Sequence, residues 1–596
     1  MMRGKSGRTH KFAESPVLQL ALPAWRSRLV AIFLLASFGL LVGRSFYLQV
    51  VNNDFLQEKG ESRYRRDLEI SASRGKVTDR NGEVLAISTP MKSIWAIPAD
   101  AKLNAQQAQQ LAKVLDADAK ELARKLASDK GFVYLQRQVS PEVADRVAAL
   151  KLPGIYQNKE YRRYYPTGDM SAHMVGFTGV DDKGLEGVEL AFEKSLIGHA
   201  GSRSVIRDRR GQIVEDVGSI RPPQDGKDVR LALDSKIQYI AYSHLKQAVA
   251  DNKAKAGGAV VIDAKSGEIL ALANWPTYNP NNREHLSGGQ LRNRAVTDTF
   301  EPGSTLKPFT AALALENGKF RFDTAINTAP GRLTIGKATI SDAHPHGVLT
   351  VAQVIQKSSN VGVAKMAATF SPQEMWEMFD AVGFGQTSRL GFPGEVPGRL
   401  RAWKSWRPIE QATMSYGHGI SVSLMQLARA YTVFARDGEL LPISLTRIDE
   451  GPVTGIPVFS PQTAREVRAM LEMAAGPGGT APKAQVAGYR VAGKTGTAHK
   501  LEGGVYANKY VASFVGFAPA SDPRLIVAVL IDEPSAGKHY GGDVAGPVFS
   551  AVMGSALRTL GVPPDAQMTI AQAPTLAPEA GSRIAQPRPV QAKEKL

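Results

Sequence analysis

The sequence predicts a multidomain α+β protein with one N-terminal transmembrane helix. Three observations carry this expectation. A long apolar run lies near the N-terminus, short apolar runs with turn signals fill residues 54–220, and two pairs of strand-like segments flank a set of helical patterns further along the chain. With 596 residues, 43% of them hydrophobic and 22% charged, the chain is long enough for several domains and can bury a large core.

The apolar run is predicted to cross a membrane. It covers residues 29–51 and begins LVAIFLLASFGLLVG, which is long enough for a hydrocarbon core of about 30 Å if Arg44 lies at the interface. Cationic residues precede it, and no small-residue cleavage site follows it. We therefore expect an uncleaved anchor with residues 1–28 in the cytoplasm and the remainder of the chain outside. The alternative is a buried core helix.

Composition excludes several classes of function. The formal net charge is +17, but no long Lys/Arg run interleaved with aromatic residues, zinc finger or RNA-binding signature is found, so we expect no nucleic-acid partner. The cysteine count of zero excludes disulfide scaffolds, thiolate metal sites and cysteine nucleophiles.

Residues 52–226 are predicted to form a non-catalytic α+β module. The tetrapeptide DRNG at residues 79–82 lies between strand-like segments and suits a tight β-hairpin turn. Residues 103–150 have helical spacing, as in AQQAQQLAKVL and KELARKLAS. A Pro/Gly-rich, polar stretch at residues 221–226 marks the boundary with the next domain.

Residues 227–560 are predicted to form a sheet packed by helices. GGAVVIDAKSGEILALAN indicates one hairpin, and YVASFVGFAP with RLIVAVLID indicates a second strand pair. The helical patterns TAALALENG and LMQLARAYTVFARDG lie between them. The tail at residues 561–596 is rich in Pro, Ala and Gln without periodicity, and we expect it to be disordered.

The first candidate catalytic motif joins Ser304 to Lys307. A Pro-Gly turn precedes it and a helical pattern follows, so Ser304 is predicted in the first helical turn with Lys307 one turn later on the same face. A neutral lysine can take the proton of a hydroxyl if burial or a nearby cation lowers its pKa. Alone, the pattern also fits a capping serine followed by a surface lysine.

Two further motifs have residues suited to the same site. Ser358 and Asn360 in KSSN follow a helical pattern and can place a hydroxyl and an amide on one turn. The same residues are also typical of an ordinary Asn/Ser turn without a function. KTGT at residues 494–497, placed before a strand-like segment, offers a cation for a carboxylate, two hydroxyl donors and a glycine that permits close approach of a substrate backbone. A phosphate loop is disfavoured because the required earlier glycine is missing.

In this order, the three motifs resemble those of the penicillin-recognising serine acyltransferases. The resemblance covers nearly the whole chain, including GRSFYLQV, SRGKVTDRNGEVLA, YYPTGDMSAHMVGFTG and GLEGVEL. On this basis the chain is identified as a member of the class B penicillin-binding proteins. KSSNVGVAK and SYGHGISVSLMQLARAY are most similar to the division-specific, septal type. The resemblance implies a serine β-lactamase-like fold for the C-terminal transpeptidase domain.

The resemblance also implies site roles. Ser304 would be the acylated nucleophile, Lys307 its general base and Ser358 the proton relay to the leaving group. The backbone N–H groups of Ser304 and Thr497 would form the oxyanion hole. Implied substrate-binding residues are Asn360, Lys494, Thr495, Gly496, Thr497, Tyr416 and Tyr540. No metal or organic cofactor is implied, and His344 and His346 fit a turn before the next helix better than a metal site.

The implied function is a septal peptidoglycan D,D-transpeptidase that cross-links stem peptides through an acyl-serine intermediate and is acylated by β-lactams. The implied location is the inner membrane, with a periplasmic catalytic domain. The implied protein partners are a division-specific polytopic glycosyltransferase and other divisome proteins. Alternatives are an elongation-type class B transpeptidase, a hydrolase of the carboxypeptidase or lactamase kind, and a non-catalytic β-lactam sensor or scaffold.

Overall fold

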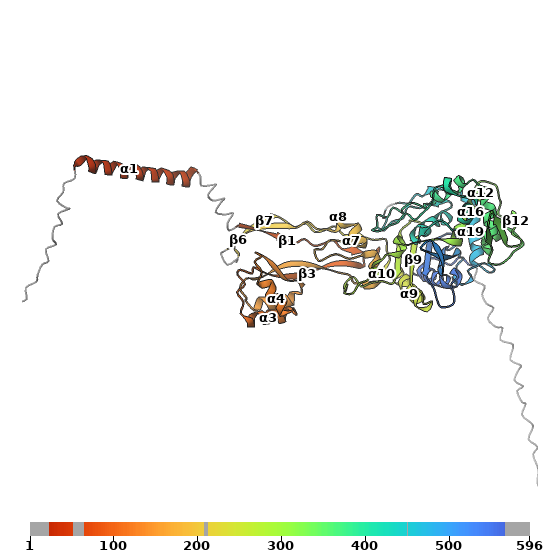
Figure 1. Cartoon of the computed structure of the whole chain (residues 1–596), viewed down its shortest axis with the longest axis horizontal. Coiled ribbons are helices and arrows are strands. Elements are labelled where there is room, and N and C mark those ends of the chain that lie inside the picture. Colours follow the sequence, from red (N-terminus) through yellow and green to blue (C-terminus); the bar gives the residue numbers. More distant parts are fainter. Residues whose placement is uncertain (1–22, 52–64, 208–212, 450, 567–596) are drawn as a thin grey trace, which may run out of the picture. The chain divides into compact units, whose positions relative to one another are not determined.

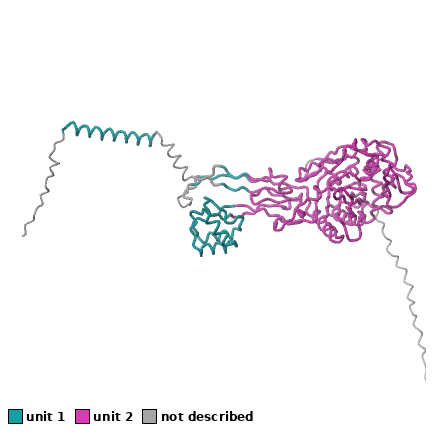
Figure 2. The backbone as a smooth tube through the Cα atoms, viewed as in Figure 1, with its two compact units in different colours: residues 1–72, 93–159, 199–224 teal, residues 73–92, 160–198, 225–596 magenta. Residues whose placement is uncertain are grey.

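A computed structural model describes residues 23–51, 65–207, 213–449 and 451–566 of the chain (Figure 1). They fall into two compact units (Figure 2), the first from residues 1–72, 93–159 and 199–224 and the second from residues 73–92, 160–198 and 225–596. The predicted tail lies largely outside the described residues, as does most of the predicted cytoplasmic segment.

The predicted N-terminal helix is present, although it begins five residues earlier than the apolar run. Helix α1 covers Ala24–Phe46 and continues into a π-helical turn, Tyr47–Val51. Its extra N-terminal residues include Arg26 and Arg28, and Pro23 stands at its N-cap. None of its residues is buried, and the span Ala24–Val50 is long and apolar enough to cross a membrane.

The first unit also contains three capped helices around a small core. They are α3 (Ala105–Leu115), α4 (Ala119–Leu126) and α5 (Pro141–Ala149), whose N-cap side chains each accept a backbone N–H. The helical expectation for residues 103–150 is wrong at β4 (Val133–Val139), where VYLQRQV has the alternation of a strand. The core side chains include Ile94, Leu111, Leu115, Leu122, Leu135 and Val147. Strands β1 (Arg65–Ile70), β6 (Gly201–Arg207) and β7 (Ile213–Arg221) form an antiparallel sheet.

The DRNG turn forms the predicted hairpin in the second unit. It joins β2 (Val77–Thr78) to β3 (Val84–Ala96), and Gly82 adopts a φ of +92° that the turn requires. Strand β8 (Val229–Arg230) pairs with β2 in parallel. The Asp79 carboxylate accepts the backbone N–H groups of Asn81 and Glu83 and also that of Ser235, which ties the turn to the start of α9 (Ser235–Asp251).

A buried charge network in the same unit includes Arg74, which lies three residues before β2. Glu189 is fully buried between Arg74 and Arg163, at 2.6 and 2.7 Å from their Nε atoms. Arg163 also donates to the backbone carbonyl of Gly75. Because breaking such a pair leaves an uncompensated buried charge, at a cost of about 3–5 kcal/mol, these residues hold segments distant in sequence together.

The sheet of the second unit confirms both predicted strand pairs and adds a strand. Its antiparallel order is β10-β9-β21-β20-β19. The strands are β9 (Ala256–Asp263), β10 (Ile269–Trp275), β19 (Ala492–Glu502), β20 (Val505–Ala518) and β21 (Leu525–Asp532). The expectation that the KTGT motif precedes a strand is wrong, because the motif lies inside β19 at the sheet edge. Helices α9 and α21 (Gly546–Thr559) pack on this sheet.

A helical cluster shares the larger of the two cores of this unit with the sheet, through Val260 and Ile262 of β9. Helix α12 (Lys307–Glu316) packs against α14 (Asn360–Ala367) and α19 (Pro461–Ala475). The predicted helix in LMQLARAYTVFARDG is two short helices, α17 (Leu424–Ala430) and α18 (Thr432–Ala435). Phe309 of α12 meets the rings of Tyr431 and Phe434 at centroid distances of 5.6 and 4.9 Å.

The remaining helices and strands complete the two units. The other helices are α6 (Ala172–Val175), α7 (Gly187–Ala191), α8 (Glu193–Leu196), α10 (Gly288–Leu291), α11 (Arg294–Thr297), α13 (Val351–Lys357), α14 (Asn360–Ala367), α15 (Pro372–Ala381), α16 (Pro408–Met414), α19 (Pro461–Ala475) and α20 (Gly541–Val544). The other strands are β5 (Ile155–Tyr164), β11 (Thr299–Phe300), β12 (Ala325–Asn327), β13 (Arg332–Ile335), β14 (Ala338–Ser341), β15 (Val348–Thr350), β16 (Val422–Ser423), β17 (Glu439–Leu440) and β18 (Ile456–Pro457).

Candidate active site

Ser304 lies in one turn of 3₁₀-helix, Gly303–Leu306, that runs directly into α12. The sequence predicted a helical turn here, and Lys307 is the first residue of the α-helix that follows. Ser304 is partly exposed, whereas Gly303, Thr305 and Leu306 are buried. Because backbone N–H groups in a first helical turn have no intrahelical partner, the N–H of Ser304 is free to bind a developing negative charge.

Close backbone contacts hold this turn in place. Gly303 has a φ of +56°, and its N–H donates to the carbonyl of Gly417 at 3.2 Å. A Cβ at Gly417 would lie only 2.2 Å from the carbonyl oxygen of Gly303, so the two glycines can pack only without side chains. The Tyr431 hydroxyl donates to the carbonyl of Thr305 at 2.8 Å. This turn, Gly303–Leu306, is called the nucleophile turn after the role expected of Ser304, and it is therefore anchored to the helical cluster.

Lys307 is fully buried, and its amino group meets the second motif. Its Nζ donates to the carbonyl oxygen of Ser358 and, at 3.0 Å, to the Ser358 hydroxyl. Burial lowers the pKa of Lys307 well below its ordinary value, the positive charge of Lys494 lowers the pKa further, and Asp342 opposes both effects. These effects favour the neutral amine, which is the state that can accept a proton.

The KSSN motif forms the junction of two helices, as its helical surroundings indicated. Ser358 caps the C-terminus of α13 in the left-handed conformation, with φ 59° and ψ 40°. Ser359 is the N-cap of α14 and accepts the N–H of Gly362. The Asn360 amide donates to the carbonyl of Ser341 at 2.9 Å.

Asp342 holds this junction, and sequence reasoning missed it. One carboxylate oxygen accepts the Ser359 hydroxyl at 2.7 Å, and the other accepts the backbone N–H of Val361 at 2.9 Å. Asp342 lies 16 residues before Ser358 along the chain and belongs to no motif, so nothing local in the sequence signals its role. Among its neighbours in the sequence, only His344 and His346 were candidate site residues.

The KTGT motif lies beside the nucleophile turn. Lys494 is fully buried, where burial lowers its pKa to about 7, and its Nζ donates to the hydroxyl of Thr495 at 3.2 Å. A Cβ at Gly496 would come within 2.7 Å of the carbonyl oxygen of Pro302, which shows how closely β19 passes the turn. The Thr497 hydroxyl accepts the N–H of Gly541 at 3.0 Å.

Each of the two predicted tyrosines is followed in the chain by a glycine that contacts a residue of the site. Tyr416 is buried, its pKa is raised by burial to about 12, and the next residue, Gly417, touches Gly303. Tyr540 is 58% exposed and precedes Gly541, the partner of Thr497. Its ring lies 4.5 Å from that of His539.

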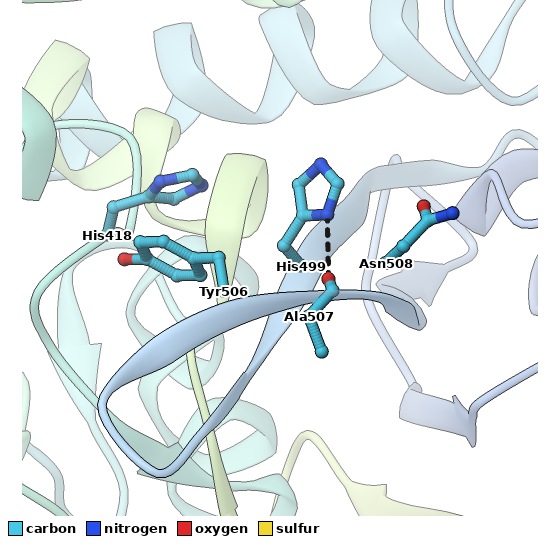
Figure 3. A pocket seen from close by; sticks show the side chains of 5 residues that line it. All are labelled: His418, His499, Tyr506, Ala507 and Asn508. Carbon is cyan, nitrogen blue, oxygen red and sulfur yellow. Dashed lines mark hydrogen bonds between the residues drawn. The ribbon is translucent and has the colours of Figure 1, made fainter.

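A second missed residue is Glu301, three positions before Ser304. Its carboxylate accepts the N–H of Gly419 at 2.8 Å and the Tyr506 hydroxyl at 3.1 Å, and burial raises its pKa. Tyr506 belongs to β20 and lines a cavity of about 320 Å³ with His418, His499, Ala507 and Asn508 (Figure 3). The pKa of His418 is lowered to about 4 by burial and by the positive charges of Lys307 and His499.

The two histidines considered for a metal lie in the segment between β14 and β15. The short strand β15 follows them, and helix α13 begins directly after it. Over residues 23–51, 65–207, 213–449 and 451–566, no group of three His, Asp or Glu side chains is arranged to hold a metal ion.

The geometry is that of an acyl-transfer site. A partly exposed hydroxyl lies one turn from a buried, deprotonatable amine, a second hydroxyl is bonded to that amine, and an edge strand with two threonines passes alongside. A sheet packed with helices around such a serine and lysine defines the penicillin-recognising serine enzymes.

Comparison with known proteins agrees with this class. Residues 257–554 match the family model of the penicillin binding protein transpeptidase domain, and residues 69–231 match that of the penicillin-binding protein dimerisation domain. The sequence is 47% identical over 544 residues to the probable peptidoglycan D,D-transpeptidase PenA of Neisseria gonorrhoeae, covering 90% of this chain and 93% of the relative. It is 43% identical over 554 residues to the peptidoglycan D,D-transpeptidase FtsI of Escherichia coli, covering 92% and 94%.

Comparison with solved structures indicates the same family. The transpeptidase domain of penicillin-binding protein 3 from Burkholderia pseudomallei is 54% identical, with a TM-score of 0.53, and the match covers 56% of this chain and 98% of that one. A peptidoglycan synthetase from Bifidobacterium adolescentis is 27% identical, with a TM-score of 0.68, over 85% of this chain and 98% of that one. The chain belongs to the penicillin-binding proteins that carry a dimerisation domain before the transpeptidase domain, which confirms the predicted family.

Proposed function

We propose that the protein is a septal peptidoglycan D,D-transpeptidase that cross-links stem peptides through an acyl-serine intermediate. Relatives that match over nine-tenths of the chain are named peptidoglycan D,D-transpeptidases, among them FtsI. The single observation that carries the reaction is the burial of Lys307 beside Ser304, with its amino group bonded to Ser358 and its pKa lowered.

In the proposed acylation, Ser304 attacks the carbonyl carbon of the terminal D-Ala-D-Ala bond. The proton of the Ser304 hydroxyl passes to Lys307 Nζ, and the backbone N–H groups of Ser304 and Thr497 bind the oxyanion. The proximity of these two peptides supports this oxyanion hole, since a Cβ on Gly303 would lie 3.6 Å from Thr497 N. Ser358, bonded to Lys307, relays the proton to the leaving D-alanine nitrogen.

The substrate is proposed to lie along β19. The hydroxyls of Thr495 and Thr497 bind its terminal carboxylate, and Gly496 lets the peptide backbone approach. Lys494 is buried beneath them, so it contributes positive charge from inside the protein and is not presented at the surface. The Asn360 amide binds the donor peptide, and Tyr416 and Tyr540 flank the cleft.

An amine of a neighbouring stem peptide then takes the acyl group from Ser304. β-Lactams acylate the same serine because their ring amide mimics the D-Ala-D-Ala bond. Both reactions need only the side chains and peptide groups named above.

The wider organisation is proposed from the sequence. Helix α1 anchors the chain in the inner membrane, with its N-terminal cations in the cytoplasm and the acylating domain, residues 227–560, in the periplasm. Residues 52–226 form the non-catalytic module that positions this domain and contacts a polytopic glycosyltransferase and other divisome proteins.

Labelling with fluorescent penicillin tests the nucleophile. The full chain in detergent is incubated with the probe, and the labelled peptide is identified by mass spectrometry. We expect covalent label on Ser304, none in Ser304→Ala, and wild-type labelling in the control Ser405→Ala, which changes an exposed serine of another segment. Equal labelling of Ser304→Ala and the wild type would refute the assignment, and rapid release of the label would favour a hydrolase.

Depletion of the protein in growing cells tests the septal role. Loss of a septal transpeptidase produces filaments because elongation continues without division. Round cells would instead identify an elongation-type enzyme.

A further inference from the structure

A groove of about 1190 Å³ runs along the catalytic unit from the neighbourhood of the nucleophile turn. Glu301, three residues before Ser304, lines it, as do Gly419 and Tyr506, which both bind the Glu301 carboxylate. Phe300, Leu424 and Val511 add apolar surface. The groove is therefore amphipathic, and Glu301 links it in sequence to the turn that carries Ser304.

The charge of this groove is unbalanced. Five arginines and two lysines line it, against four acidic residues. The arginines are Arg292, Arg294, Arg399, Arg401 and Arg407. A cleft lined mainly by one sign of charge attracts ligands of the opposite sign, so the groove suits an anionic ligand.

The acidic residues do not use all of these donors. Asp298 and Glu410 are each shared between two of the arginines. Arg399 is exposed, and its side chain has no hydrogen-bond or ion-pair partner among the described residues. Arg294 donates instead to Asp298 and to the carbonyl of Gly289. The guanidinium group of Arg399 thus keeps its donors free for a carboxylate.

A smaller cavity continues the groove along the strand that carries the KTGT motif. His499 and Tyr506 line both spaces, and His418 closes the smaller one, with its ring 6.1 Å from that of Tyr506 (Figure 3). His499 is two residues beyond Thr497 on β19, so their side chains point to the same face of the strand. A chain lying in the groove can therefore reach the acylated serine past His499 and Tyr506.

We propose that this groove binds the acceptor stem peptide, with a carboxylate at Arg399 and its amine directed toward the acyl carbon on Ser304. This inference rests on the proposed function, since it assigns the second substrate of the same reaction. The amine nitrogen bonds to the acyl carbon, the bond from that carbon to Ser304 Oγ breaks, and the proton lost by the amine returns to Ser304 Oγ through Lys307. Donor and acceptor thus approach from different directions.

The test separates acceptor binding from acylation. The full chain in detergent receives a small acyl-D-alanyl thioester donor and one of two acceptors that share the same amine, a tripeptide with two free carboxylates or its bis-amide. The ratio of aminolysis to hydrolysis is measured against acceptor concentration. Arg399→Glu is expected to need about tenfold more of the acidic acceptor for half-maximal aminolysis, and Arg399→Ala an intermediate amount. The bis-amide is expected to respond equally in all variants.

Arg321→Glu is the matched control, because Arg321 is also exposed, has no side-chain partner among the described residues and lies outside the groove. It should behave as the wild type. Unchanged dependence on the acidic acceptor in Arg399→Glu overturns the inference. Failure of the wild type to be labelled by fluorescent penicillin would instead refute the proposed function.

Discussion

Lys307 Nζ donates a hydrogen bond of 3.0 Å to the Ser358 hydroxyl, and the backbone carbonyl of the same serine accepts a second hydrogen bond from it. The two residues come from different helices, α12 and the end of α13. This relationship fixes the amine in a buried place one turn from Ser304, and it gives the amine a hydroxyl through which a proton can leave.

Two substitutions of Ser358 separate its chemistry from its backbone conformation. Both Ser358→Ala and Ser358→Gly remove the hydroxyl but keep the carbonyl that binds Lys307, so acylation by fluorescent penicillin should slow by about 100-fold in each. Only glycine relieves the left-handed φ of 59°, so Ser358→Gly should be more stable than Ser358→Ala by about 1 kcal/mol in thermal unfolding. Wild-type acylation in both variants would remove Ser358 from the proton path.

Asp342→Asn should change both the rate and the pH dependence of acylation. The Asp342 carboxylate raises the pKa of Lys307, so its removal should lower that pKa further and move the acid limb of the pH–rate profile to lower pH. The rate at the plateau should also fall, because the junction at Ser359 loses a hydrogen bond. Asp323→Asn, an exposed carboxylate elsewhere, is the control. A shift of the acid limb to higher pH would contradict this electrostatic role.

Lys494 should make the folded state more stable at alkaline pH. Its pKa is lowered to about 7 in the folded chain, whereas the unfolded chain keeps the proton up to about pH 10.4. Between these values the unfolded state binds more protons, so the free energy of unfolding rises with pH, by up to about 1.4 kcal/mol per pH unit for one such group. The thermal midpoint of the wild type should therefore rise more between neutral and alkaline pH than that of Lys494→Met. Equal slopes in the two proteins would show that Lys494 is not buried as described.

Gly417→Ala should disturb the nucleophile turn more than a comparable change elsewhere. A Cβ there would lie 2.2 Å from the carbonyl oxygen of Gly303, and φ is +86°. Gly336→Ala is the control, because Gly336 has a φ of +63° but open space around it. We expect the control to lose about 1–2 kcal/mol of stability and to keep its acylation rate, whereas Gly417→Ala should lose more stability and acylate slowly. Equal behaviour of the two variants would mean that the contact with Gly303 is unimportant.

The sequence predicted those parts of the fold that depend on local patterns. The DRNG turn and the hairpin at Gly267 require positive φ at glycines, and the strands they join are recognisable within a few residues. The order of the three motifs likewise identified the family. Strand β19 was missed because glycine and two cations interrupt its apolar pattern, and only pairing with β20 makes it a strand.

The missed residues of the site depend on contacts between distant segments. Asp342 acts on Ser359 and Val361, and Glu301 acts on Gly419 and Tyr506, more than one hundred residues further along the chain. Neither carboxylate belongs to a motif. The sequence predicts which side chains perform the chemistry, whereas the residues that hold them in place become visible only once the chain is folded.

The central claim is that burial and the charge of Lys494 lower the pKa of Lys307 far enough for its neutral amine to serve as the base for Ser304. The measurement that tests it most directly is the second-order rate constant for acylation of Ser304 by fluorescent penicillin as a function of pH. The account predicts a rate that levels off well below about pH 10 and falls on acidification. A rate that continues to rise tenfold per pH unit up to about pH 10, the ordinary pKa range of lysine, would contradict it.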